Sequence, residues 1–170
     1  MQYIHYYNSP MGQILLIADE IGLTDLLFEN EECHLQPDHS ISVTPAIHET
    51  IQWLDEYFSG NLPAFTPPLH LIGSKFQMEV WNLLLAIPYG EISTYGHLAK
   101  CIAAERGITR MSAQAVGGAV GSNPVSIIVP CHRVIGTGNN LTGYASGLDN
   151  KIFLMKLEGH NMDNFKDPRK

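Results

Sequence analysis

Residues 61–69 read NLPAFTPPL, and this proline-rich stretch separates two halves of different character. Its three prolines remove backbone donors and disfavour a helix. Short apolar runs typical of strands precede it, and segments with helical spacing follow it. We therefore expect an N-terminal α/β domain over residues 1–72, with a linker near 61–72, and a mainly helical domain over residues 73–170.

The N-terminal half carries signals for a hairpin and a helix. Apolar runs at residues 14–17 and 23–28 flank the sequence ADEIG, whose Asp, Glu and Gly suit a tight reversal. Further on, Thr44 is placed as an N-cap, Pro45 at the first helical position and Gly60 as a terminator. The apolar stripe of this helix is formed by Ile47, Ile51, Leu54 and Phe58.

The C-terminal half begins with Ser74 and Gln77 at the spacing of a capping box, which predicts a helix from residue 75. Thr94 is suited to cap a second helix over residues 95–104, and a third begins near Ser112. Two short helices joined by a polar turn fit a helix-turn-helix or any antiparallel helix pair, and the pattern alone favours the simple pair.

The third helix contains almost no side-chain bulk, because Gly117 and Gly118 lie among alanines. Each glycine costs a helix interior about 1 kcal/mol relative to alanine, so a close approach should compensate. The helix backbone could press against a neighbouring helix or enter a narrow groove, and the pattern does not decide between the two.

Composition narrows the class of protein. The chain has 170 residues, 45% of them hydrophobic, and a net charge of −7, which argues against binding nucleic acid mainly by neutralising phosphates. Its three cysteines contain no C-x-x-C pair, so we expect neither a disulfide framework nor a zinc finger. The N-terminus lacks a basic segment before an apolar run, and no apolar stretch reaches 18 residues. We expect a cytoplasmic protein that is neither secreted nor inserted in a membrane.

A thiol and an imidazole are adjacent in residues 127–134, which read IIVPCHRV. If Cys131 were extended, its sulfur and the His132 ring would point to opposite faces, so a bend or a water must connect them. Glu158 in KLEG offers a carboxylate that could orient the imidazole. Taken alone, such a pair is more often a chance neighbour or core pair than a catalytic site.

The wider pattern gives this pair a context. Residues 123–159, NPVSIIVPCHRVIGTGNNLTGYASGLDNKIFLMKLEG, closely resemble the active-site block of the O6-alkylguanine-DNA alkyltransferases, also called methylated-DNA–protein-cysteine methyltransferases. The resemblance extends to IPYGEISTYGHLAK, AVGGAVGSNP and, more loosely, SPMGQILLIADEIGLTDLLF, so it covers most of the chain.

Membership of this family implies a ribonuclease-H-like N-terminal domain, with a small antiparallel sheet and a helix, and a winged-helix-like C-terminal domain with a helix-turn-helix. It implies direct reversal of DNA damage by an irreversible, single-turnover transfer of the alkyl group of O6-alkylguanine, with O4-alkylthymine as a second possible substrate, to Cys131 after base flipping. The implied partner is double-stranded DNA, bound through its minor groove by a monomer, with no cofactor and no membrane.

The resemblance also implies catalytic roles. Cys131 aligns with the alkyl acceptor, His132 with its water-linked base and Glu158 with the carboxylate behind that histidine. Asn123 aligns with the asparagine that braces this network and the bend before the active-site strand. Tyr95 aligns with the tyrosine that donates a proton to N3 of the departing guanine, and its alternative role is that of a half-buried helix residue.

Other positions align with the walls of the base pocket. Tyr144 matches a wall position, and small or main-chain groups nearby come from Val134, Gly143, Ala145 and Ser146. Lys151 matches a lysine near the base, and its alternative role is an exposed helix cation.

The DNA-binding positions include one departure from the family. Most relatives have an arginine before AVGG, which fills the gap left by the flipped base, but this chain has Gln114. We expect Gln114 to occupy the gap and Arg110, in a lengthened connection that also contains Arg106, to bind a phosphate. The remaining expected DNA contacts are Thr94, Ala115, Gly117 and Gly118, because small side chains fit a groove about 6 Å wide.

Three further expectations concern residues outside this site. Arg133 should reach an acidic group of the N-terminal half and fix the joint between domains. Cys33, with His34 and His39 close by, lacks a four-ligand pattern, so we expect no metal. Cys101 is expected to be a packing thiol.

Two rival functions stay open at this point. A damage-binding protein without chemistry is one, although such relatives lack the acceptor cysteine. A thiol hydrolase that uses Cys131 and His132 repeatedly is the other.

Overall fold

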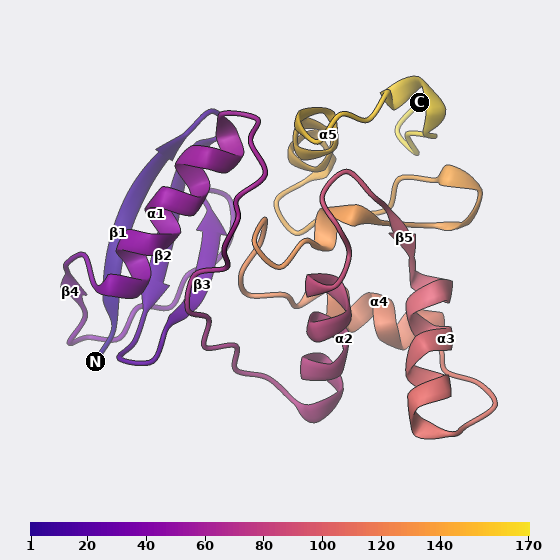
Figure 1. Cartoon of the computed structure of the whole chain (residues 1–170), viewed down its shortest axis with the longest axis horizontal. Coiled ribbons are helices and arrows are strands. Elements are labelled where there is room, and N and C mark those ends of the chain that lie inside the picture. Colours follow the sequence, from indigo (N-terminus) through magenta and orange to yellow (C-terminus); the bar gives the residue numbers. More distant parts are fainter. The chain divides into compact units, whose positions relative to one another are not determined.

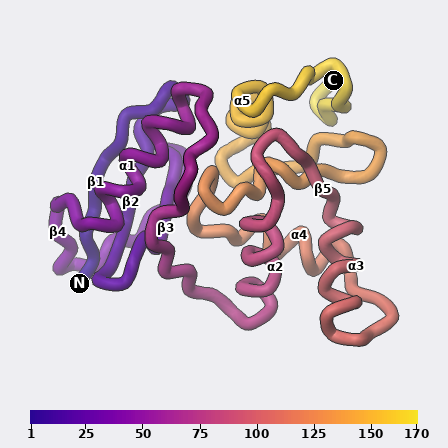
Figure 2. The backbone as a smooth tube through the Cα atoms, viewed as in Figure 1, coloured from indigo at the N-terminus to yellow at the C-terminus, as the bar shows by residue number.

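The computed structural model describes all 170 residues and divides into two compact units, which we describe separately (Figures 1 and 2). The first contains Met1–Ile72 and Pro124–Ile128, and the second contains Gly73–Asn123 and Val129–Lys170. The sequence prediction had placed residues 124–128 in the C-terminal domain. They group with the first unit because the Leu26 backbone N donates to the carbonyl of Pro124 at 2.9 Å.

The first unit is built on a four-stranded sheet of order β3-β2-β1-β4. β1 (Tyr3–Ser9), β2 (Gly12–Ala18) and β3 (Leu23–Phe28) are antiparallel, and the predicted hairpin is β2–β3. β4 (Ser40–Ile41) pairs in parallel with β1, so the sheet is mixed rather than purely antiparallel.

Helix α1 (Pro45–Phe58) lies against one face of this sheet (Figure 1). As predicted, Thr44 caps it, accepting a hydrogen bond from the Ile47 backbone N at 3.3 Å, and Pro45 is the first helical residue. Ile47 and Leu54 are completely buried, as are Ile14 and Leu16 of β2. Apolar burial between helix and sheet therefore forms the core of this unit.

The second unit begins with three helices packed on one another, α2 (Lys75–Leu85), α3 (Tyr95–Arg106) and α4 (Ala113–Gly121), as the tube in Figure 2 shows. The predicted N-caps of the first two helices are confirmed: Ser74, in a complete capping box, and Thr94. α4 begins close to its predicted start, and Ser112 is its N-cap. α3 and α4 form the predicted pair, with Gly107 ending α3 in the left-handed conformation at φ 65°.

The rest of the second unit carries short elements that position the thiol. β5 (Ser93–Thr94) pairs in parallel with β6 (Val134–Ile135), and α5 (Leu148–Leu157) follows, with single 3₁₀ turns at Thr137–Asn139 and Met162–Asn164. Cys131–Arg133 forms a 3₁₀ turn before β6, so Cys131 is not extended and the chain bends at this point. No helix in the chain is both long and apolar enough to cross a membrane.

Candidate active site

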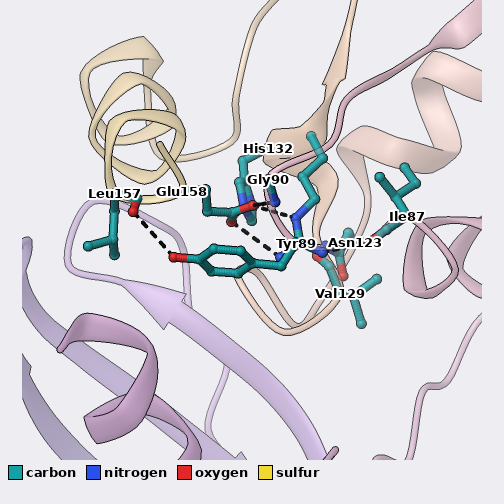
Figure 3. Close-up of polar contacts among 9 residues, drawn as sticks. Ile87, Tyr89, Gly90, Asn123, Val129, His132, Leu157 and Glu158 are labelled. Carbon is teal, nitrogen blue, oxygen red and sulfur yellow. Dashed lines mark hydrogen bonds and ion pairs between the residues drawn. The ribbon is translucent and has the colours of Figure 1, made fainter. Parts of the chain in front are cut away.

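Glu158, directly after α5, is the centre of a buried polar cluster (Figure 3). Its carboxylate accepts hydrogen bonds from Nε2 of His132 and from Nε of Arg133, the latter at 2.7 Å. The backbone N of Gly90 donates to the same carboxylate at 3.1 Å. The side chains of Glu158 and His132 are both 0% exposed, so this pair is closed to solvent.

The surroundings fix the charges of the pair. Burial alone would raise the pKa of Glu158, but the hydrogen bonds and charges of His132 and Arg133 outweigh burial and hold that pKa well below its ordinary value. Burial lowers the pKa of His132, although Glu158 opposes the shift. At neutral pH we therefore assign an ionised carboxylate and a neutral imidazole.

The hydrogen bond to Glu158 also selects the tautomer of the imidazole. An ionised carboxylate only accepts, so Nε2 carries the proton and Nδ1 carries a free lone pair. Nδ1 is buried and has no hydrogen-bond partner among the protein atoms. His132 and the preceding Cys131 lie on the same 3₁₀ turn, and Cys131 is 6% exposed.

Asn123, at the end of the α4 segment, reaches the chain just before the thiol. Its side-chain Nδ2 donates to the Val129 carbonyl at 2.7 Å (Figure 3), and the Cys131 backbone N donates to the same carbonyl at 2.8 Å. These two contacts join Asn123 to the segment before Cys131, and the bracing role that the resemblance implies for Asn123 stays a prediction.

Lys151 is fully buried, so its predicted alternative as an exposed helix cation is wrong. Its ammonium donates to the Val134 carbonyl at 2.6 Å and to Oγ1 of Thr142 at 3.3 Å. Burial lowers the pKa of Lys151 to about 8, while the charge of Cys131 opposes the shift. The Cys131 charge also acts on Tyr95, whose pKa is raised first by burial. Both side chains therefore lie within electrostatic range of the sulfur.

An open cavity of about 590 Å³ lies beside these groups. Tyr95 of α3 and Thr142 line it, and their hydroxyl oxygens are 2.6 Å apart. The other residues that line it are Gly96, Ala113, Gln114, Gly117, Gly136, Thr137 and Gly143. A volume of this size accommodates a small ligand.

The structure brings together only part of the predicted pocket wall. Tyr144, Ala145 and Ser146 form the loop before α5 and are not among the residues that line the cavity. Cys131 and Val134 do not line it either, and Val134 contributes its carbonyl to Lys151.

The predicted DNA-binding residues lie mainly on α4. Ala115 and Gly118 are exposed, and so is Gln114, at the rim of the cavity. The remaining three differ in setting. Gly117 lies beside the Tyr95 ring, Arg110 is exposed in the α3–α4 connection, and the Thr94 hydroxyl is occupied as a helix cap.

The prediction for Arg133 is wrong. Its acidic partner is Glu158 of its own unit, not a residue of the N-terminal half, and its Nη1 donates to the Ile87 carbonyl at 2.7 Å. The guanidinium carbon also lies 5.7 Å from the centre of the Tyr89 ring. Sequence reasoning also missed Thr142, for which the only signal was its place in TGYASG, beside residues already selected.

Comparisons with known proteins bear on this arrangement. A family model described as 6-O-methylguanine DNA methyltransferase, ribonuclease-like domain, matches residues 2–71. A second, described as 6-O-methylguanine DNA methyltransferase, DNA binding domain, matches residues 75–160.

Whole-chain similarity agrees with both models. A methylated-DNA–protein-cysteine methyltransferase of Methanosarcina acetivorans is 46% identical over 158 residues, covering 92% of this chain and 98% of that protein. One from Haemophilus influenzae is 41% identical, covering 92% and 86%. The crystal structure of Mycobacterium tuberculosis OGT in complex with DNA matches with a TM-score of 0.81 at 38% identity, covering 92% of each chain. This chain therefore belongs to the methylated-DNA–protein-cysteine methyltransferase family.

Proposed function

We propose that this protein repairs DNA by moving the alkyl group of O6-alkylguanine to the sulfur of Cys131, once per molecule. The observation that carries the proposal is the buried Glu158–His132 pair next to that cysteine. The pair leaves a neutral imidazole with its Nδ1 lone pair unused, which is the group needed to accept a thiol proton.

The reaction begins when the thiol proton of Cys131 passes to Nδ1 of His132 through one water. The resulting imidazolium is stabilised by the carboxylate of Glu158, which already accepts the Nε2 proton. The thiolate is the strongest nucleophile among the standard side chains, and it attacks the alkyl carbon bonded to O6. The S–C bond forms as the C–O bond breaks, and the electron pair of that bond leaves with the guanine.

The departing guanine is an anion that needs a proton. Tyr95 lines the cavity, so its phenol is available to donate a proton to N3 of the base. The product on Cys131 is a thioether, which has no good leaving group. No second nucleophile is provided to displace it, so each molecule acts once.

DNA binding is assigned to the exposed face of α4. The guanine must leave the duplex before its O6 can meet the sulfur, at a cost of a few kcal/mol. Gly118 and Ala115 present little bulk on this exposed face, which fits entry of α4 into the minor groove. Gln114 fills the gap left by the base and Arg110 contacts a phosphate. The protein acts as a monomer on duplex DNA.

The need for a reduced Cys131 thiol bears on where in the cell the protein works. A thiol that must be reduced to act is best kept in a reducing cytoplasm, and none of the three cysteines is in a disulfide. We therefore propose that the protein works in the cytoplasm.

The test is intact mass spectrometry after incubation with a duplex that contains one O6-methylguanine. The proposal predicts a gain of one methyl group, lost in Cys131→Ala but kept in Cys33→Ala, a control in the first unit. Binding of the lesion without a mass gain would favour a damage-binding protein. Repeated hydrolysis of a small ester, with no methyl gain, would favour a thiol hydrolase.

A further inference from the structure

Three side chains of the second unit form a continuous line of hydrogen bonds. Nζ of Lys151, on α5, lies 3.3 Å from Oγ1 of Thr142, and that oxygen lies 2.6 Å from the phenol oxygen of Tyr95 on α3. Lys151 is 0% exposed, whereas Thr142 and Tyr95 line the cavity. The line therefore runs from a buried ammonium to the cavity that Tyr95 lines.

The chemistry of the ammonium gives this line a direction. An ammonium only donates, so Oγ1 of Thr142 accepts from Lys151 and retains one proton of its own. The phenol oxygen of Tyr95 is the neighbour that can take this proton. When it does, the proton of Tyr95 is left free to point into the cavity.

Lys151 is anchored independently of the Thr142 hydroxyl. Its ammonium also donates to the Val134 carbonyl at 2.6 Å and approaches the Thr142 carbonyl at 3.4 Å. Removing the hydroxyl alone would leave both main-chain contacts in place, so the hydroxyl can be tested separately from the ammonium.

We propose that Thr142 is a positioning residue, whose hydroxyl turns the Tyr95 proton toward the base and passes a proton from Lys151 to Tyr95 as that proton is used. This inference rests on the proposed transfer of an alkyl group to Cys131.

The S–C bond forms, the C–O6 bond breaks, and the guanine anion takes the phenol proton at N3. The Tyr95 oxygen takes the hydroxyl proton of Thr142, and the Thr142 oxygen takes one proton from Lys151. Lys151 is left as a neutral amine, which regains its proton from solvent after the DNA has left.

The electrostatic setting suits this direction of transfer. Burial raises the pKa of Tyr95, so loss of the phenol proton is unfavourable unless the phenol oxygen receives another proton. Lys151 is the better source of a proton, since burial lowers its pKa to about 8. The titratable groups with electrostatic contact to Lys151 are Cys131 and His132, both on the 3₁₀ turn.

The experiment compares single-turnover transfer rates of wild type, Thr142→Val and Thr142→Ser on two duplexes. One contains O6-methylguanine, and the other contains O6-methyl-3-deazaguanine, in which a C–H replaces the N3 acceptor. Valine keeps the shape of threonine and loses only the hydroxyl, and serine keeps the hydroxyl. Thr66→Val, an exposed residue of the proline-rich stretch, is the matched control.

We expect Thr142→Val to slow transfer from O6-methylguanine about 10- to 100-fold, less than the loss of a general acid itself would, because Tyr95 is still present. Thr142→Ser and Thr66→Val should stay close to wild type. On the 3-deaza substrate, wild type and Thr142→Val should react at nearly equal rates. The ratio of wild-type to Thr142→Val rates on O6-methylguanine should also fall as the pH rises through about 8, as Lys151 loses its proton.

Two results would overturn the relay: equal rates of wild type and Thr142→Val on O6-methylguanine, or the same slowing on both substrates, which is the mark of a merely structural role. A wild-type protein that transfers no methyl group would instead overturn the proposed function, so the two failures are distinguishable.

Discussion

Glu158 accepts hydrogen bonds from His132 and Arg133 with the same buried carboxylate. One carboxylate thus orients the proposed base and balances the charge of a guanidinium whose side chain is only 10% exposed. Reactivity and folding are linked at this residue, so a change to it should affect both.

Glu158→Gln should slow methyl transfer by about 100-fold, because a neutral amide no longer stabilises the imidazolium of His132. The measurement is the single-turnover rate on a duplex with one O6-methylguanine at pH 7.5. Glu91→Gln, at an exposed residue of the loop between α2 and β5, is the matched control and should react at the wild-type rate. An unchanged rate in Glu158→Gln would remove the carboxylate from the mechanism.

The same substitution should reduce the free energy of unfolding by about 3 kcal/mol at neutral pH, because it leaves the Arg133 charge without a counter-charge. The pKa of Glu158 is lowered in the folded state, so its stabilisation is present above the unfolded-state pKa of about 4.3 and is lost as pH falls below that value. Denaturant unfolding should therefore show that the difference in free energy of unfolding between wild type and Glu158→Gln becomes smaller from pH 6 to pH 3. A difference that stays constant would contradict this assignment of charge.

Substitutions at Gly118 distinguish the stability of α4 from its proposed entry into the DNA minor groove. Both Gly118→Ala and Gly118→Leu should raise the stability of the free protein, by up to about 1 kcal/mol, since glycine is a poor helix former and a Cβ there meets nothing within 4 Å. Only leucine adds bulk that a narrow minor groove would exclude. We expect duplex binding to fall at least 10-fold in Gly118→Leu and little in Gly118→Ala, as measured by fluorescence anisotropy. Equal binding by the two variants would place α4 outside the groove.

Arg110 and Arg106 form a matched pair of cations. Both are exposed, but Arg106 forms an ion pair with Glu79 at 2.9 Å and lies over the Phe76 ring, whereas Arg110 lies in the α3–α4 connection. Arg110→Ala should weaken duplex binding and reduce the slope of log affinity against log salt by about 1, and Arg106→Ala should leave that slope unchanged. Gln114→Ala should slow repair without changing the slope. The division of roles fails if Arg110→Ala keeps the wild-type slope and Gln114→Ala keeps the wild-type rate.

Local signals made much of the helical structure predictable from the sequence. Thr44, Ser74 and Thr94 all cap helices as predicted, since a cap depends on residues only three positions apart. The β2–β3 hairpin was predictable for the same reason, because its strands are joined by a short reversal.

The features that sequence reasoning missed depend on distant parts of the chain. The parallel β1–β4 pairing joins residues more than 30 positions apart, and Leu26 bonds to Pro124 across almost 100. No local pattern encodes such partners. The acid that meets Arg133 was misplaced for this reason: Glu158 lies 25 positions along the chain, in a contact that only the folded unit defines.

The motif identified the main residues of the candidate site, but it did not reveal all of the hydrogen bonds between them. Cys131, His132 and Glu158 were selected from PCHRV and KLEG, and the structure brings His132 and Glu158 into contact. Thr142 was missed because a lone threonine in a loop has no signature of its own. Its position between Lys151 and Tyr95 appears only when α3 and α5 are both in place.

The most direct test of the central claim is a titration of the protein with excess duplex carrying isotope-labelled O6-methylguanine, followed by peptide mapping. The account predicts that labelled methyl rises to one per chain and then stops, with all of it on the peptide that contains Cys131. Restored guanine in excess of the protein, or label on Cys33 or Cys101 instead, would contradict it.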